Sequence, residues 1–351
     1  MVPPISAIDL FCGAGGLSYG LRQAGLRIAG GFDNDPGCRH PYETNIGATF
    51  FERDVRQVTA PELAALWQEG SIRVLAGCAP CQPFSSYRRG VDTTRDERWP
   101  LLNAFGELID GTLPDVVTME NVPRVVNSAV YRSFVELLVR NHYEMSSRVC
   151  FCPEYGLPQR RRRLVLIASR IGRIDVPRGR YSKDEFVTVK DTIESLPKVA
   201  SGQADPADQL HRSRDLSDLN LQRIRASKQG GTWRDWPEEL RAPCHRRATG
   251  DSFGSVYARM EWDSPAPTIT TQAYNFGTGR FGHPEQDRPI TIREAAMLQG
   301  FPRTYAFVPE TAKVELAPLC RMIGNAVPPP LGNAVGTAIV EHVRARYRTD
   351  A

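Results

Sequence analysis

The 351-residue sequence lacks the features that would assign it to several large classes of protein. No stretch approaches the roughly 20 consecutive apolar residues of a transmembrane helix, and no basic region precedes the first apolar residues, as it does in secretion signals. Eight cysteines are too few for a disulfide-stabilised scaffold of this length. The charges almost balance, with 44 Lys and Arg against 40 Asp and Glu, so the net charge of +4 is only weak evidence of an anionic partner. We expect a cytoplasmic globular protein without membrane association, in which cysteine serves chemistry rather than cross-linking.

Alternating apolar runs and amphipathic stretches in the N-terminal half predict an α/β fold. Residues 5–11, 28–33 and 115–121 are short apolar or β-branched runs, and stretches with helical periodicity separate them. Runs that are apolar on both faces and separated by helices are typical of a parallel sheet covered on both sides. The last two strand patterns lie at 145–151 and 163–169. We expect a mixed, mostly parallel sheet with an antiparallel strand late in the order.

A change of composition about halfway along the chain predicts a second domain. Pro, Ser, Asp and Arg dominate residues 178–283, where strand patterns become rare. We expect this segment to form a smaller, irregular domain, with residues 1–177 forming the larger one and residues 284–351 returning to it. Helical patterns resume in that last segment, where Thr291 is expected to cap a helix with Glu294 three residues on.

Residues suited to a nucleoside ligand follow three of the predicted strands. The first strand runs into the glycine-rich turn Phe11-Cys12-Gly13-Ala14-Gly15, while Asp33 and Asp54 close the next two. Glycines let the backbone approach a ligand closely, and open α/β sheets bind ligands beyond the carboxyl ends of their strands. A carboxylate at the second strand end can accept ribose hydroxyls, and one at the third can accept an adenine amino group. The alternative for either aspartate alone is a solvated turn residue or a helix cap.

The fourth predicted strand leads into Cys78-Ala79-Pro80-Cys81, which favours a nucleophile. Pro80 fixes the backbone just before Cys81 and so holds its sulfur at the functional edge of the sheet. The Cys-x-x-Cys spacing also occurs in metal sites and redox pairs. We expect no metal, because zinc requires four ligands and the other close pair, Cys150 and Cys152, lies on a distant strand.

An acid and two cations are expected at the same edge of the sheet. Glu120 lies at the end of the fifth predicted strand, and the run Gln159-Arg160-Arg161-Arg162-Arg163 adjoins the last one. In an extended chain the alternate members Arg161 and Arg163 would project to one side. A thiol, a carboxylic acid and fixed cations are therefore predicted to share one site.

In this order, the segments resemble those of the bacterial C5-cytosine-specific DNA methyltransferases. The resemblance covers nearly the whole chain and rests on DLFCGAGG, GFDNDP, RDV, GCAPCQPFS, MENV, QRRRRLVLIA, RPITIREAAMLQGFP and RMIGNAVPPPLGNAVG. It implies a Rossmann-like domain that uses S-adenosylmethionine, with residues 178–283 as the target-recognition domain. It also implies double-stranded DNA as the substrate, a monomeric enzyme acting at the bacterial nucleoid, and a separately acting cognate restriction endonuclease.

The resemblance further implies roles for individual residues. Cys81 would be the nucleophile, Glu120 would bind the target base, and Arg161 and Arg163 would support the base and the site. The S-adenosylmethionine pocket would consist of Phe11, Gly13, Gly15, Asp33, Asn34, Asp54, Pro80, Asn325 and Val327. Many relatives carry a large aromatic residue where this chain has Asn34. The DNA-binding residues would be Ser85, Arg88, Arg89, Arg241, Arg246 and Thr270.

The chemistry of cytosine methylation explains why these residue types occur together. Cytosine C5 is a poor nucleophile until a thiolate adds at C6, so the reaction needs an activated cysteine, and an acid at N3 offsets the charge that enters the ring. The base must leave the duplex before a side chain can reach it. The polar segment 82–100 is expected either to close over bound DNA or to be a solvated loop. Arg259 and Arg280 are further candidates for contacts with phosphates or guanine edges.

Two other hypotheses stay open at this point. A related class of enzyme acts on transfer RNA with the same order of catalytic motifs, although its Cys-Phe-Thr signature is not evident in this chain. The second hypothesis is an inactive DNA-binding regulator with the same fold. The joint presence of Cys81, Glu120, Arg161 and Arg163 argues against it.

Overall fold

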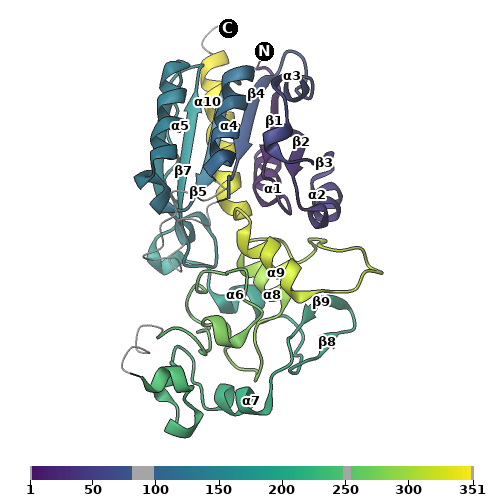
Figure 1. The fold of residues 1–351 in the computed structure, drawn as a ribbon, viewed down its shortest axis with the longest axis vertical. Helices are drawn as coiled ribbons and strands as arrows, with labels where there is room; N and C mark the ends of the chain where they lie inside the picture. Colours follow the sequence, from purple (N-terminus) through teal and green to yellow (C-terminus); the bar gives the residue numbers. More distant parts are fainter. Residues whose placement is uncertain (1, 81–98, 248–253, 349–351) are drawn as a thin grey trace. The chain divides into compact units, whose positions relative to one another are not determined.

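The computed structural model describes residues 2–80, 99–247 and 254–348, which form two compact units (Figure 1). Unit 1 consists of Met1–Tyr155, Arg162–Arg180 and Ala326–Ala351, and unit 2 consists of Gly156–Arg161 and Tyr181–Asn325. By this division the C-terminal part of the chain returns to unit 1 at Ala326, and the expected bounds 1–177, 178–283 and 284–351 stay predictions. The functional division into a catalytic and a target-recognition domain stays a prediction.

Unit 1 is built on a seven-stranded sheet in the order β3-β2-β1-β4-β5-β7-β6. The strands are β1 (Ile5–Leu10), β2 (Arg27–Asp33), β3 (Phe50–Glu52), β4 (Ile72–Gly77), β5 (Val116–Asn121), β6 (Glu144–Phe151) and β7 (Arg162–Ser169). β7 pairs antiparallel with both of its neighbours, and every other pairing in this sheet is parallel. The predicted mixed, mostly parallel sheet with a late antiparallel strand is confirmed.

Helices of unit 1 cover both faces of this sheet. They are α1 (Gly16–Gln23), α2 (Arg39–Ile46), α3 (Ala60–Ala64), α4 (Trp99–Thr112), α5 (Ala129–Arg140) and α10 (Pro329–Arg348). On one face α3, α4 and α5 bury Leu63, Phe105 and Phe134 in a core shared with the strands. On the other face α1 and α10 pack against each other. There Ser18 of α1 donates to the buried Asp9 of β1 at 2.7 Å.

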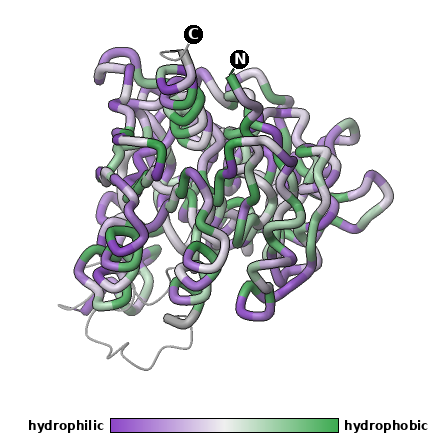
Figure 2. Tube along the Cα trace, turned by 90° about the horizontal axis from the view of Figure 1, so that it is seen from above, coloured by the Kyte–Doolittle hydropathy of each residue, from purple (hydrophilic) through white to green (hydrophobic). Residues whose placement is uncertain are grey.

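The apolar character of the strands places the main core inside unit 1. Leu10, Leu75 and Met119 are fully buried there, each on a different strand. Figure 2 shows hydrophobic stretches running through the interior, with hydrophilic segments mainly at the turns that project outward. Among the described residues, no helix is long and apolar enough to cross a membrane.

Unit 2 contains little regular structure. Its elements are the strands β8 (Ala204–Asp205) and β9 (Asp208–Arg212) and the helices α6 (Val189–Ile193), α7 (Asp218–Arg225), α8 (Ile292–Leu298) and α9 (Leu316–Asn325). The predicted cap of α8 is confirmed, because Thr291 and Glu294 form a reciprocal capping box. The rest of the unit consists largely of turns and short 3₁₀ segments, so side-chain hydrogen bonds must fix the loops.

Arg259 supplies many of those hydrogen bonds. The residue is 5% exposed, and its guanidinium donates to the carbonyl oxygens of Ile224, Ser227, His283 and Gln286. It also pairs with the carboxylate of Asp287. The expectation that Arg259 contacts DNA is therefore wrong, because the side chain is buried and its donors are used inside unit 2.

Candidate active site

The turn after β1 adopts a backbone conformation that leaves space beside it. Phe11, Gly13 and Gly15 have φ angles of 59°, 51° and 89°, in the left-handed region that favours glycine. A Cβ atom on Gly13 would meet no atom within 4 Å. Glycine is therefore required there by the backbone angle and not by crowding, and the open side of the turn can accept a ligand close to the main chain.

Asp33 connects the end of β2 to this turn. Its carboxylate accepts hydrogen bonds from the amide nitrogen of Gly13 at 2.9 Å and from that of Asp35 at 3.0 Å. Burial raises the pKa of Asp33, while these backbone bonds lower it in part. The first two strand ends thus meet through one carboxylate, whose remaining lone pairs can accept hydroxyl groups. Asn34, the next residue, is exposed.

Asp54 has a local structural role after β3. Its carboxylate accepts a hydrogen bond from the amide nitrogen of Arg56 at 2.9 Å and forms an ion pair with the Arg56 guanidinium. The side-chain bond from Arg56 lowers the pKa of Asp54. The residue caps the 3₁₀ turn Val55–Gln57, as the alternative interpretation anticipated. Its role toward an adenine stays a prediction.

The segment before the predicted nucleophile Cys81 is held in place at Ala79. Cys81 lies outside the described residues, together with Ser85, Arg88 and Arg89 and nearly all of the expected closing segment. Ala79, two residues earlier, is buried, and its carbonyl oxygen accepts a hydrogen bond from the side-chain amide of Asn121 at 3.2 Å. The end of β5 therefore anchors the segment that enters Cys81.

Glu120 is the most distinctive group at this edge of the sheet. It is 5% exposed, and its two carboxylate oxygens have different neighbours. Arg163 Nε lies 3.0 Å from Oε1, and Cys78 Sγ donates to Oε2 at 3.1 Å. The geometry of the ion pair leaves Oε1 without a hydrogen bond from the described residues. A buried carboxyl oxygen of this kind can exchange a hydrogen bond or a proton with a heterocyclic base.

The position of Cys78 was missed by the sequence interpretation, which gave it no role in the site. The pairing of β4 with β5 sets Gly77 opposite Met119, so the next residues along, Cys78 and Glu120, emerge side by side. The only signal in the sequence was the spacing of Cys78 from Cys81, and that spacing indicates a metal or redox pair equally well. Among the described residues, no group of three or more His, Cys, Asp or Glu side chains is arranged to hold a metal ion.

Arg161 and Arg163 have different partners in the structure. Arg163, at the start of β7, belongs to unit 1 and contacts Glu120. Arg161 belongs to unit 2, is 2% exposed, and donates to the carbonyl oxygens of Ile269 at 3.2 Å and Gly324 at 3.1 Å. The shared action of both arginines on one base stays a prediction.

The remaining predicted residues fall on both units. Asn325 ends α9 in unit 2, whereas Val327 belongs to unit 1. In unit 2, Arg241 donates to the carbonyl oxygen of Arg234 at 2.7 Å, and the exposed Arg246 donates to that of Glu238 at 2.9 Å. Thr270 is half-buried, and its hydroxyl accepts from the amide nitrogen of Gln272 at 3.4 Å. Their contacts with cofactor or DNA stay predictions.

Comparison with known proteins shows which family this chain resembles. The model of the C-5 cytosine-specific DNA methylases matches residues 5–341. The Type II methylase M.HgiDII of Herpetosiphon aurantiacus is 46% identical over 351 residues, which cover 98% of each chain. The Type II methyltransferase M1.HphI of Haemophilus parahaemolyticus is 29% identical, with 96% of this chain and 87% of the relative covered.

A solved structure supports the fold independently. The chain superposes with a TM-score of 0.73 on a prophage-encoded protein of E. coli described as a DNA modification methyltransferase. The two are 22% identical, and 96% of this chain and 99% of the other are covered. The sequence resemblance and the α/β Rossmann-like fold are therefore confirmed, and the chain belongs to the C-5 cytosine-specific DNA methylase family.

Proposed function

We propose that this protein transfers a methyl group from S-adenosylmethionine to C5 of a cytosine within a specific sequence of double-stranded DNA, with Cys81 as the nucleophile. The observation that best supports the proposal is the Glu120 site. At the end of β5 this buried carboxylate contacts the Arg163 guanidinium and the thiol of Cys78, the residue that follows β4 and precedes Cys81 by three positions. Family membership gives the reaction class, and this site offers the group that binds the base.

In the proposed mechanism, the Cys81 thiolate forms a bond to C6 of a cytosine that has left the duplex. The electron pair of the C5–C6 double bond moves toward C5, which becomes able to attack an electrophile. A free cysteine has a pKa of about 8.5, so the thiolate requires stabilisation by a nearby cation. Arg163 is proposed to be the cation that stabilises the Cys81 thiolate. After methylation at C5, a base removes the C5 proton, the double bond re-forms, and the sulfur leaves.

Glu120 is proposed to hold the target base by its N3 edge. Arg163 and Cys78 contact the two carboxylate oxygens and so fix the orientation of the side chain. Oε1, which carries no hydrogen bond from the described residues, is then the atom that shares a proton with N3. This interaction offsets the negative charge that Cys81 introduces into the ring.

The residues after β1 and β2 fit S-adenosylmethionine, which supplies an electrophilic methyl group when bound. Gly13 borders open space, and Asp33 offers carboxylate oxygens that suit ribose hydroxyls. Asp54 is proposed to accept from the adenine amino group with the lone pairs that Arg56 does not use. Phe11, Gly15, Asn34, Pro80, Asn325 and Val327 are proposed to complete the pocket.

The proposed biological setting is a bacterial restriction-modification pair. The similar length and the 46% identity to a Type II methylase support this setting. In it the protein acts as a monomer on DNA of the nucleoid, in the cytoplasm, and a separate endonuclease cuts the same sequence when it is unmethylated.

Bisulfite sequencing of DNA from cells that express the protein tests the proposal. We expect 5-methylcytosine at one sequence context with the wild type and none with Cys81→Ser. A parallel assay with tritiated cofactor should label plasmid DNA and leave transfer RNA unlabelled. Label in transfer RNA alone, or methylation that persists in Cys81→Ser, would contradict the proposal.

A further inference from the structure

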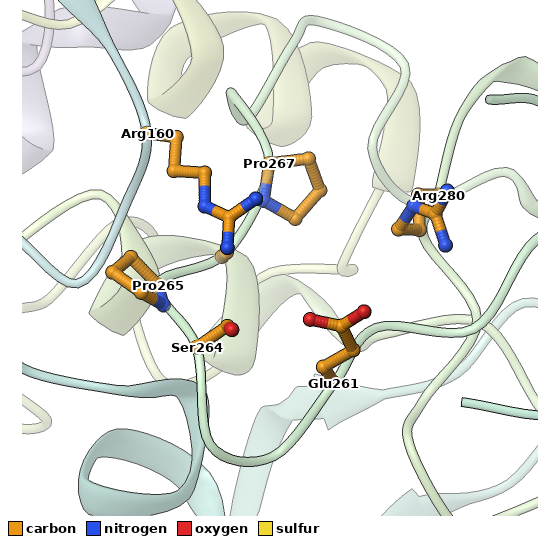
Figure 3. Close-up of a pocket in the computed structure, with 7 residues that line it drawn as sticks. Arg160, Glu261, Ser264, Pro265, Pro267 and Arg280 are labelled. Carbon is orange, nitrogen blue, oxygen red and sulfur yellow. The ribbon is translucent and has the colours of Figure 1, made fainter. Parts of the chain in front are cut away.

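Unit 2 contains a cavity of about 160 Å³ that has no part in the proposed reaction at C5. The proline-containing segment Ser264–Pro267 forms one side of it, and Arg160, Glu261 and Arg280 supply charged side chains (Figure 3). We call it the Arg-Glu cavity. All of its lining residues belong to unit 2.

Two of the charged residues in the cavity, both exposed, have no side-chain partner among the residues that the structure describes. Within the described chain, the Arg160 guanidinium and the Glu261 carboxylate form neither a hydrogen bond nor an ion pair with any residue. Figure 3 shows both groups projecting into the cavity, from opposite sides of the open space. Opposite charges that face one cavity without pairing offer donors and an acceptor to a third molecule.

The turn at Gly230 and Gly231 lies against the exposed Glu261 carboxylate and binds the Arg280 guanidinium. Gly230 has a φ angle of +68°, and a Cβ atom there would overlap Glu261 Oε1, so the carboxylate lies directly against this glycine. Arg280 Nη1 donates to the carbonyl oxygen of Gly231 at 2.8 Å, which leaves most of its five N–H groups for a ligand. Consecutive glycines thus border an acceptor group and bind a donor group.

The opposite wall of the cavity is also held by the backbone. The amide nitrogen of Arg160 donates to the carbonyl oxygen of Ala266 at 2.7 Å, and that of Ala266 donates to Pro158 at 2.9 Å. Val189 donates to the carbonyl oxygen of Ser264 at 3.0 Å. The wall is therefore formed before any ligand arrives, which reduces the entropy lost on binding.

The charges indicate the chemistry of the ligand. A phosphate group would meet the Glu261 carboxylate, which repels it, so a simple phosphate contact does not fit. In the major groove, the edge of a G·C pair presents two acceptors, guanine N7 and O6, followed by a donor, cytosine N4. Arginine suits the first two atoms and glutamate the third. Arg280 and Glu261, which both border this pair of glycines, match that order.

We propose that the Arg-Glu cavity recognises one G·C base pair of the sequence that this enzyme methylates. Arg280, with Arg160 from the facing wall, donates to guanine, and Glu261 accepts from the cytosine amino group. This inference rests on the proposed function and deepens it, because it assigns part of the sequence specificity to three residues of unit 2.

Methylation of a randomised duplex library, read by sequencing, tests the inference. We expect the wild type to require a G·C pair at one position of its motif, and Glu261→Leu, which has no acceptor, to relax that position by roughly 5- to 150-fold while keeping the others. Gly230→Ala, which leaves Glu261 in the chain but displaces its carboxylate, should relax the same position. The control is Glu285→Leu, which removes an exposed carboxylate of unit 2 that pairs with Lys198 outside the cavity and should keep the wild-type motif.

The outcomes separate this inference from the function on which it rests. A defined wild-type motif that Glu261→Leu leaves unchanged would overturn the inference alone. Equal loss of methylation on all sequences would overturn it as well, because it would indicate a contact with the phosphate backbone. No 5-methylcytosine from the wild type would contradict the proposed function and the inference together.

Discussion

The two units hold their functional groups by different means. In unit 1 the site lies at strand ends, so the register of a regular sheet decides that Cys78 and Glu120 emerge together. In unit 2, where regular structure is scarce, single side chains such as Arg259 hold the loops. We therefore expect substitutions at the sheet edge of unit 1 to lower catalytic activity while the protein stays folded. Substitutions of the buried side chains that hold the loops of unit 2, such as Arg259, should instead disrupt the fold of the unit that is proposed to contact DNA.

The largest expected effect lies in unit 1. Glu120→Gln keeps the shape of the side chain but removes its ability to donate a proton, so we expect kcat to fall by roughly 10²- to 10⁴-fold. The melting temperature should stay within the error of the wild type. Glu136→Gln, an exposed glutamate on α5, is the matched control and should retain full turnover. Normal turnover in Glu120→Gln would remove the acid from the mechanism.

The corresponding test of unit 2 is Arg259→Ala. The substitution leaves buried carbonyl oxygens and Asp287 without their donor, and we expect the free energy of unfolding to fall by about 3 to 5 kcal/mol. Arg225→Ala is the control, because Arg225 pairs with the same Asp287 from an exposed position and should contribute less than about 1 kcal/mol. Chemical denaturation measures both variants, and equal losses would show that Arg259 is no special anchor.

A third prediction concerns the pH dependence of stability in unit 1. Burial raises the pKa of Asp9 from its usual value of 3.8 to about 7, while the hydrogen bond from Ser18 opposes the shift. The folded protein therefore keeps a proton that the unfolded chain loses near pH 4, and stability falls as the pH rises toward 7. Asp9→Asn removes this dependence.

The measurement is the difference in unfolding free energy between Asp9→Asn and the wild type. From pH 5 to pH 8 that difference should shift in favour of the variant by roughly 3 kcal/mol. A difference that is the same at both pH values would show that Asp9 ionises normally in the fold.

The smallest expected effect concerns Cys78. If its thiol orients Glu120, Cys78→Ala should lower kcat by about fivefold, the value of one modest hydrogen bond, with little change in KM. Cys78→Ser restores a donor and should recover most of the loss. Equal activity in the alanine and serine variants would show that the contact at 3.1 Å has no part in catalysis.

The sequence predicted those features that depend on local pattern. Apolar periodicity identified the strands of unit 1 but not β8 and β9 of unit 2, the glycine-rich turn marked the end of β1, and Thr291 marked the start of α8. Each of these signals is contained within a few neighbouring residues, which is why composition and spacing are enough to find them.

Features that depend on long-range contacts were not predictable from the same patterns. The meeting of Cys78 with Glu120 follows from strand register, which a single sequence does not specify. The burial of Arg259 follows from the folding of distant loops around one side chain. An arginine in a polar segment looks the same in the sequence whether it is buried or exposed. The sequence therefore carries no sign that Arg259 is buried and unable to contact DNA.

Covalent trapping shows directly whether Cys81 bonds to the target cytosine. Duplex oligonucleotides that contain 5-fluorocytosine at the methylated position should form a stable adduct with the wild type when S-adenosylmethionine is present, because a fluorine at C5 cannot leave as a proton does. Mass spectrometry of the digested adduct should locate the bond on Cys81, and Cys81→Ser should form none. The absence of an adduct, or a bond to any other residue, would contradict the account.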